Sequence, residues 1–173
     1  MITNKEIENN KNPNITTEDL IYYLERNKAD MALRRPDNIT QEEFDNLVRQ
    51  WPDYALWHCK DKLNSAQFHY CVNKSPDYAL IFCWDKLNSE QRHMCIHSAP
   101  GTAIDAHLDK LDEDQLYTCA RLAPGDALEH CPDKLDELLF DYCVHAEPDT
   151  ARIYCEEKLT AEQREYCEKH KND

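Results

Sequence analysis

The sequence contains very little glycine: Gly101 and Gly125 are the only two in its 173 residues. Loops that cradle phosphate groups need several glycines close together, because backbone N–H groups must approach the ligand. Other catalytic signatures are also missing, namely HExxH, GxSxG, and the combination of HxE with PCxxC. These absences predict a protein that is not an enzyme and that needs no cofactor.

Long apolar runs are missing as well. The mean hydropathy is −0.84, and no segment approaches the roughly 18 apolar residues that a membrane span requires. The first twenty residues are polar and contain nothing like the apolar core of a secretory signal. We therefore expect a soluble, cytoplasmic protein, in its own cell or in a host cell, with no membrane partner.

Cysteine is plentiful, but its spacing fits neither a disulfide framework nor a zinc site. An odd count of nine without a secretory signal predicts free thiols in a reducing compartment, and no CxxC pair is present. The cysteines recur at regular intervals, at Cys59, Cys71, Cys83, Cys95, Cys119, Cys131, Cys143, Cys155 and Cys167. His107 stands where this series would place another cysteine.

The cysteine series belongs to a 24-residue repeat. Each full unit begins with a proline, at Pro52, Pro76, Pro100, Pro124 and Pro148. The expected units are about 29–51, 52–75, 76–99, 100–123, 124–147 and 148–171. Self-similarity at a fixed period predicts a solenoid, in which each unit packs only on its neighbours.

The two ends of the repeat are expected to close the solenoid. In the last unit, Arg164, Glu168 and Lys171 occupy inward positions that are apolar in earlier units, which is typical of a capping helix. Residues from Ile15 onward resemble the second half of one further unit. The sequence thus predicts a single repeat domain over residues 15–173, preceded by a flexible segment over residues 1–14.

Each unit is expected to contain two α-helices, which we call helix A and helix B. Proline suits the first turn of helix A, because its missing N–H would have no helical partner there. Asn64 and Gln67 have the spacing of a capping box at the start of helix B, and other units repeat this pattern. The predicted fold class is all-α: a right-handed α-solenoid of about six 24-residue two-helix repeats with polar capping ends.

On these helices both cysteines of a unit point inward. Reduced cysteine behaves as a small buried hydrophobe, so we interpret the series as packing between units. An incomplete metal site is the alternative, since zinc requires four converging ligands. The candidate ligands are Cys95, His107 and Cys119 in the core, and His93 with His97 on the outer face of helix B.

The units also carry the pattern AL-x-x-[AC], as in ALWHC at residues 55–59 and ALIFC at residues 79–83. Together with the 24-residue period, this pattern resembles the bacterial leucine-rich-repeat variants over residues 29–171. The resemblance implies a curved, helical binding scaffold, and it assigns no site residues.

The outward positions of helix A differ between units, and we expect function where the units differ. These positions are aromatic or apolar in the second and third units and acidic in the fourth and fifth. The predicted partner-binding residues, which we call the helix-A surface, are Tyr54, Trp57, Tyr78, Ile81, Asp105, Asp109, Asp126, Glu129 and Asp133. The nearby Trp84 is a further predicted contact, because Trp and Tyr dominate the energetics of protein interfaces.

Charge follows the same polarity along the chain. Residues 1–99 carry a net charge of −3 and residues 100–173 carry −11, which together give the −14 of the whole chain. A field of this sign attracts basic proteins and repels nucleic acid. We therefore expect a non-enzymatic scaffold that binds a protein with a basic or mixed basic and apolar surface.

The alternative function is a small acidic inhibitor of the anti-defence type, which would mimic nucleic-acid charge and block a basic groove of its partner. A solenoid of six units at about 9 Å each would carry about one charge per 4 Å, whereas duplex DNA carries one per about 1.7 Å. The mimicry would therefore be sparse. The sequence leaves the oligomeric state open.

Overall fold

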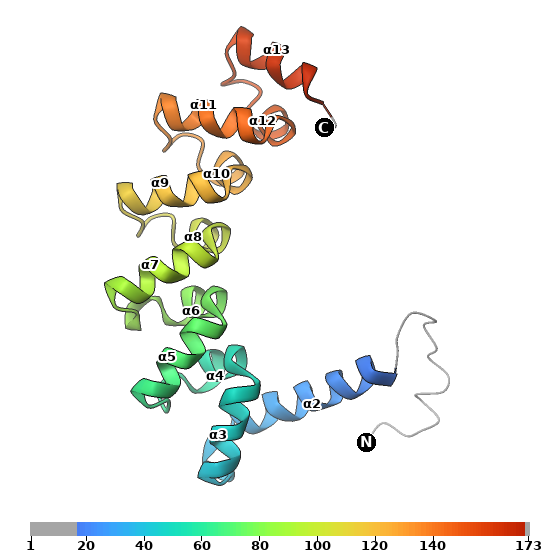
Figure 1. Cartoon of the computed structure of the whole chain (residues 1–173), viewed down its shortest axis with the longest axis vertical. Helices are drawn as coiled ribbons and strands as arrows, with labels where there is room; N and C mark the ends of the chain where they lie inside the picture. Colours follow the sequence, from blue (N-terminus) through green and yellow to red (C-terminus); the bar gives the residue numbers. More distant parts are fainter. Residues whose placement is uncertain (1–16, 172–173) are drawn as a thin grey trace.

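The structure is a computed structural model that describes residues 17–171. The predicted flexible segment over residues 1–14 lies outside the described residues. Within residues 17–171 every regular element is helical, and the helices stack into a single column that ends at α13 (Figure 1). The all-α solenoid predicted from the repeat is therefore confirmed.

Helices A and B alternate along the chain. Helix A of each proline-initiated unit is α4 (Pro52–Cys59), α6 (Pro76–Cys83), α8 (Pro100–His107), α10 (Pro124–His130) or α12 (Pro148–Tyr154). The B helices are α3 (Gln41–Gln50), α5 (Ser65–Lys74), α7 (Ser89–Ser98), α9 (Glu113–Leu122), α11 (Glu137–Ala146) and α13 (Ala161–Lys169). The remaining elements are α2 (Thr17–Leu33) and two short 3₁₀ helices, η1 (Pro36–Asn38) and η2 (Trp84–Lys86).

A sharp turn precedes helix A in all five proline-initiated units. The residue before each proline has φ between −131° and −143° and ψ between 63° and 67°. Proline pushes its preceding residue out of the α-helical region and tolerates the first helical turn. Each proline therefore ends one B helix and begins the next A helix.

Capping boxes set the start of most B helices, as predicted. In α5, the Asn64 side chain accepts a hydrogen bond from the Gln67 backbone, and the Gln67 side chain accepts one from the Asn64 backbone, both at 2.9 Å. The same reciprocal pair begins α3, α7, α9 and α13. In α11 Leu139 replaces the glutamine, and only the Asp136 side chain caps the helix.

The main packing contacts among the described helices join neighbouring units. Consecutive A helices contact one another, and so do consecutive B helices, so two parallel stacks run the length of the column (Figure 1). The core between the stacks contains all nine cysteines together with the alanine and leucine or isoleucine of the A helices. The predicted inward orientation of the thiols is confirmed, whereas the right-handed sense of the solenoid stays a prediction.

The core thiols are inert by environment. Burial raises the pKa of Cys71 and of Cys119 to about 12, with desolvation as the largest cause. Several thiols also donate to a backbone carbonyl of the preceding unit, as Cys155 Sγ does to Leu128 at 3.3 Å. This contact joins adjacent units through the core.

His107 makes the same contact to the preceding unit as these core thiols. Its Nε2 lies 2.6 Å from the Leu80 carbonyl, which is the contact that Cys83 Sγ makes to Leu56 one unit earlier, at 3.7 Å. A carbonyl can only accept, so Nε2 carries the proton. The histidine therefore replaces a cysteine while keeping its donor to the preceding unit.

The two ends of the column differ. At the C-terminal end, Arg164, Glu168 and Lys171 are exposed, as a polar cap requires. At the other end, the expected half unit does not fold back as a separate helix: α2 runs without a break through Lys28, the position one period before Pro52. Because no proline interrupts it there, the first half of α2 points away from the column (Figure 1).

None of the helices described over residues 17–171 is both long enough and apolar enough to cross a membrane.

Candidate protein-binding surface

The aromatic part of the helix-A surface is only partly exposed. Trp57 and Ile81 are 43% and 47% exposed and occupy equivalent positions on α4 and α6. Tyr54 and Tyr78 are half-buried one turn before them. The two neighbouring units therefore present an apolar strip whose outermost residues are Trp57 and Ile81.

Ring contacts fix Trp57 in place. Its ring stacks on His58 with centroids 4.3 Å apart and on Phe82 of the next unit at 5.6 Å. Arg34 of the loop after α2 lies over the Trp57 ring, 5.9 Å from its centroid. An exposed aromatic residue held on several sides loses little side-chain entropy when it binds a partner.

α2 contributes residues that sequence reasoning missed. Arg26 donates from Nε to the Tyr54 hydroxyl at 2.8 Å and lies over the Tyr54 ring, and its Nη2 is 3.4 Å from Asp53. Asp30 lies 2.7 Å from His58 Nε2. The 24-residue spacing alone did not reveal these contacts, because α2 lacks the proline and cysteine markers of the other units.

Trp84 does not belong to the exposed surface. It is only 7% exposed and lies in η2, where its ring packs on His107 with centroids 4.2 Å apart. Arg92 lies over the Trp84 ring at 5.1 Å from the centroid. Trp84 thus packs in the core beside His107, which replaces the cysteine of other units. We therefore omit Trp84 from the proposed contacts.

The acidic part of the surface contacts residues of the neighbouring units. Asp105 lies 3.0 Å from His130 Nε2. Glu129 accepts a hydrogen bond from the Tyr154 hydroxyl, which raises the tyrosine's pKa. The carboxyl of Asp126 rests against Gly101, where an added Cβ would lie 2.5 Å from Oδ2. The structure thus brings the acidic residues of α8 and α10 together with polar partners.

A ladder of ion pairs runs along the edge of this surface. The lysine before the turn from helix A to helix B pairs with the aspartate of the preceding unit. These pairs are Lys62 with Asp37, Lys86 with Asp61, Lys110 with Asp85, and Lys158 with Asp133. Lys134 instead donates to the Leu108 carbonyl at 3.2 Å, beside Asp109. These ion pairs therefore join successive units.

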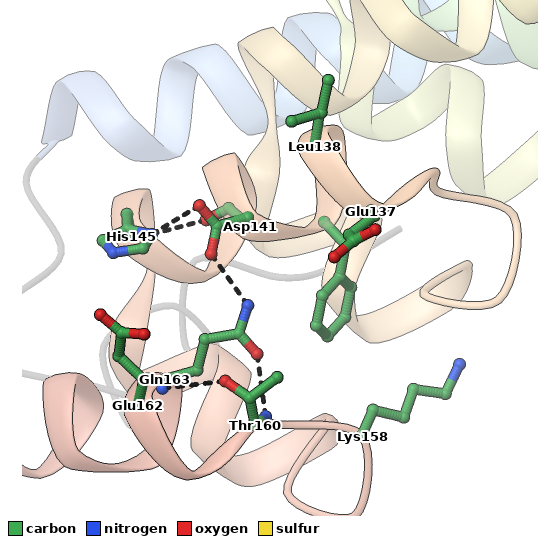
Figure 2. A pocket seen from close by; sticks show the side chains of 9 residues that line it. Glu137, Leu138, Asp141, His145, Lys158, Thr160, Glu162 and Gln163 are labelled. Carbon is green, nitrogen blue, oxygen red and sulfur yellow. Dashed lines mark hydrogen bonds and ion pairs between the residues drawn. The ribbon is translucent and has the colours of Figure 1, made fainter.

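The hollow between α11 and α13 has a volume of about 510 Å³ and an open, polar lining (Figure 2). Gln163 donates to Asp141 at 2.9 Å across it, and Figure 2 shows Gln163 turned toward both Asp141 and Thr160. Four units earlier, Gln67 makes the same bond to Asp45 at 2.8 Å beside another hollow. The hollow is a recurring gap between B helices, so it does not mark a unique site.

Neither alternative metal site gathers enough ligands. Among residues 17–171, no group of three or more His, Cys, Asp or Glu side chains is placed to hold a metal ion. His107 is committed to the Leu80 carbonyl, and the exposed His93 and His97 rings contact only as a pair, 4.5 Å apart.

Comparison of the chain with protein-family models, with curated proteins and with solved structures finds no match. The resemblance to the leucine-rich-repeat variants therefore stays a prediction.

Proposed function

We propose that this chain is a non-enzymatic scaffold that binds another protein through the helix-A surface. The observation that carries the proposal is Trp57, which is 43% exposed and yet held by His58, Phe82 and Arg34. A rigid, accessible Trp beside a second apolar residue, here Ile81, is typical of an interface hot spot. The partner would bury this strip.

The acidic residues of α8 and α10 indicate the chemistry of the partner. They continue the same row of outward positions beyond Ile81, so one elongated partner surface could contact both parts. Their charge would steer basic groups during association and contribute less to the final affinity. We therefore propose a partner with an apolar patch flanked by basic residues, in a reducing cytoplasm where the buried thiols stay free.

Inhibition by nucleic-acid mimicry is the second candidate. The lysine–aspartate ion pairs between units weigh against it. Asp61, Asp85 and Asp133 each pair with a lysine of the following unit. Each such pair removes a charge that a mimic would need to present, and DNA is already denser in charge than this chain. Most of the chain's net negative charge, −11 of −14, lies in residues 100–173, so a mimic would have to use that part of the chain.

The experiment compares capture of a partner by immobilised full-length variants. A partner captured by the wild-type chain should be lost with Trp57→Ala and retained with Tyr117→Ala. Tyr117 is a suitable control, since it is an exposed aromatic residue on the B helix α9, away from the helix-A surface. Loss with Tyr117→Ala and retention with Trp57→Ala would place binding on the other stack and contradict the proposal.

A further inference from the structure

The N-terminal end of the column leaves apolar side chains uncovered. On the first half of α2, Ile21, Tyr22, Tyr23 and Leu24 are each about half exposed. These residues lie on the part of α2 that points away from the stacked units (Figure 1). The C-terminal end, in contrast, exposes the polar residues Arg164 and Glu168. Among residues 17–171, the first half of α2 therefore offers an apolar surface that projects beyond the column.

The repeat assigns these residues to a core. Tyr23 and Leu24 lie two periods before Cys71 and Val72, which are fully buried on α5. In α2 the same positions are 57% and 50% exposed. The first half of α2 therefore has the inward face of a B helix, but no unit within residues 17–171 packs on that face.

The matching groove lies on the same molecule. A hollow of about 770 Å³ opens between α2 and α3, and its apolar lining includes Ala32, Ile39, Leu47 and Trp51. Each later B helix is covered on this side by the B helix before it, as α5 is by α3. The hollow thus continues the established stack of B helices at the position where one more helix would pack.

We propose that a second copy of this chain fills the groove. In this dimer the first half of each α2 packs, through Tyr23 and Leu24, against α3 of the other copy. Tyr22 stays with its own chain, where its ring contacts Trp51 with centroids 5.4 Å apart. One copy thereby supplies the B helix that the other lacks, and the exchange is reciprocal.

Area and charge both fit this occupant. Without Tyr22, the three half-exposed side chains Ile21, Tyr23 and Leu24 contribute about 300 Å² per helix, so two helices and two grooves bury about 1,200 Å², the lower end of the range for a stable interface. The contact also joins the weakly charged ends, since residues 1–99 carry −3 and residues 100–173 carry −11. The strongly acidic halves would then lie at the far ends of the dimer.

The absent proline explains why a second copy, and not the chain itself, covers the groove. Pro52 and its equivalents break the chain before helix A, whereas Lys28 occupies that position in α2 and the helix continues. A continuous helix cannot turn back onto its own α3. Lys28→Pro would restore the turn and let the first half of α2 pack on its own chain.

Analytical ultracentrifugation of the full chain tests the proposal. The wild type should dimerise, and the double change Tyr23→Glu with Leu24→Glu should weaken the dimer at least about 100-fold, because two buried apolar contacts are replaced by charges. Leu138→Glu is the matched control: Leu138 is 84% exposed on α11, far from α2. It should leave the dimer unchanged. Lys28→Pro should give a folded monomer.

Circular dichroism should show that the double variant keeps its fold, because both side chains are about half exposed in the single chain. If Lys28→Pro does not fold, comparison of the double variant with Leu138→Glu still tests whether α2 forms the dimer contact. A wild type that stays monomeric up to about 100 μM, well above the Kd expected of a stable interface, overturns the proposal. So does a dimer that persists in the double variant or that Leu138→Glu dissociates equally.

Discussion

At the scale of single residues, one contact between neighbouring units recurs in the core with different chemistry. Cys83 and Cys155 donate through Sγ, and His107 donates through Nε2, each to a carbonyl of the preceding unit. The thiol packs as a small apolar group, and its hydrogen bond is weak. What the position requires is therefore a compact side chain that can donate to the neighbouring unit.

Substitutions of His107 test this requirement. His107→Ala should lower the free energy of unfolding by about 2 kcal/mol, because it removes the donor to Leu80 and leaves a cavity beside Trp84. His107→Cys restores the residue found at this position in the other proline-initiated units and should lower the free energy of unfolding by less. Urea denaturation of both variants measures the difference. Equal losses in the two variants would show that the donor does not matter.

The buried thiols should make stability depend on alkaline pH. Burial raises the pKa of Cys71 and Cys119 to about 12, while the pKa of a thiol in the unfolded chain is about 8.5. Because the folded pKa is the higher one, the stabilisation is complete below pH 8.5 and is lost as the pH rises toward 12. The free energy of unfolding should therefore fall between pH 8.5 and 11.

Urea midpoints at several pH values measure this fall, and a double variant with Cys71→Ala and Cys119→Ala is the control. It should lose stability at neutral pH through lost packing but show a shallower decline above pH 8.5. An unchanged decline in the double variant would show that Cys71 and Cys119 do not cause the effect.

At the scale of the helices, caps and prolines decide where each element begins. In α7 the Asn88 side chain accepts from the Gln91 backbone at 2.8 Å and the Gln91 side chain accepts in return. Asn88→Ala should lower the free energy of unfolding by about 1 kcal/mol, whereas Asn88→Asp keeps a capping oxygen and should cost little. Thermal or urea denaturation of the pair checks this, and a loss in both variants would contradict it.

Much of this architecture could be predicted from the sequence, because its signals are local. Proline at the first position and the Asn-to-Gln spacing act within a few residues, so they predicted the boundaries of α5 and α7 correctly. α2 could not be predicted in the same way, since the half unit was inferred by analogy with units that contain the proline. In α2 the helix continues through Lys28, one period before Pro52, and it does not turn back.

The site was less predictable, because it depends on contacts between units. Period and helical geometry placed Trp57 and Ile81 outward, as the structure has them. They also suggested Trp84, which follows Cys83 directly and folds inward over His107. Arg26, which reaches Tyr54 from a helix 28 residues earlier, carries no local signal.

At the scale of the whole molecule, neighbour-only packing makes the column long. A compact globule of this length would have a radius of gyration of about 16 Å. Small-angle X-ray scattering should give a clearly larger value, and the Tyr23→Glu, Leu24→Glu variant is the suitable sample because the proposed dimer would not contribute. A value near 16 Å would contradict the extended stack.

The same column separates an aromatic end from an acidic one, and the proposed function depends on which end dominates binding. The most direct measurement is the dissociation constant of the purified complex at low and high salt, for the wild type, for Trp57→Ala, and for the combined neutralisation of Asp126, Glu129 and Asp133. We expect Trp57→Ala to weaken binding by about 2 kcal/mol, or about 30-fold, at both salt concentrations, while the acidic variant mainly slows association. Abolition of binding by the acidic variant, with a steep salt dependence and little effect of Trp57→Ala, would contradict the scaffold and support a charge mimic.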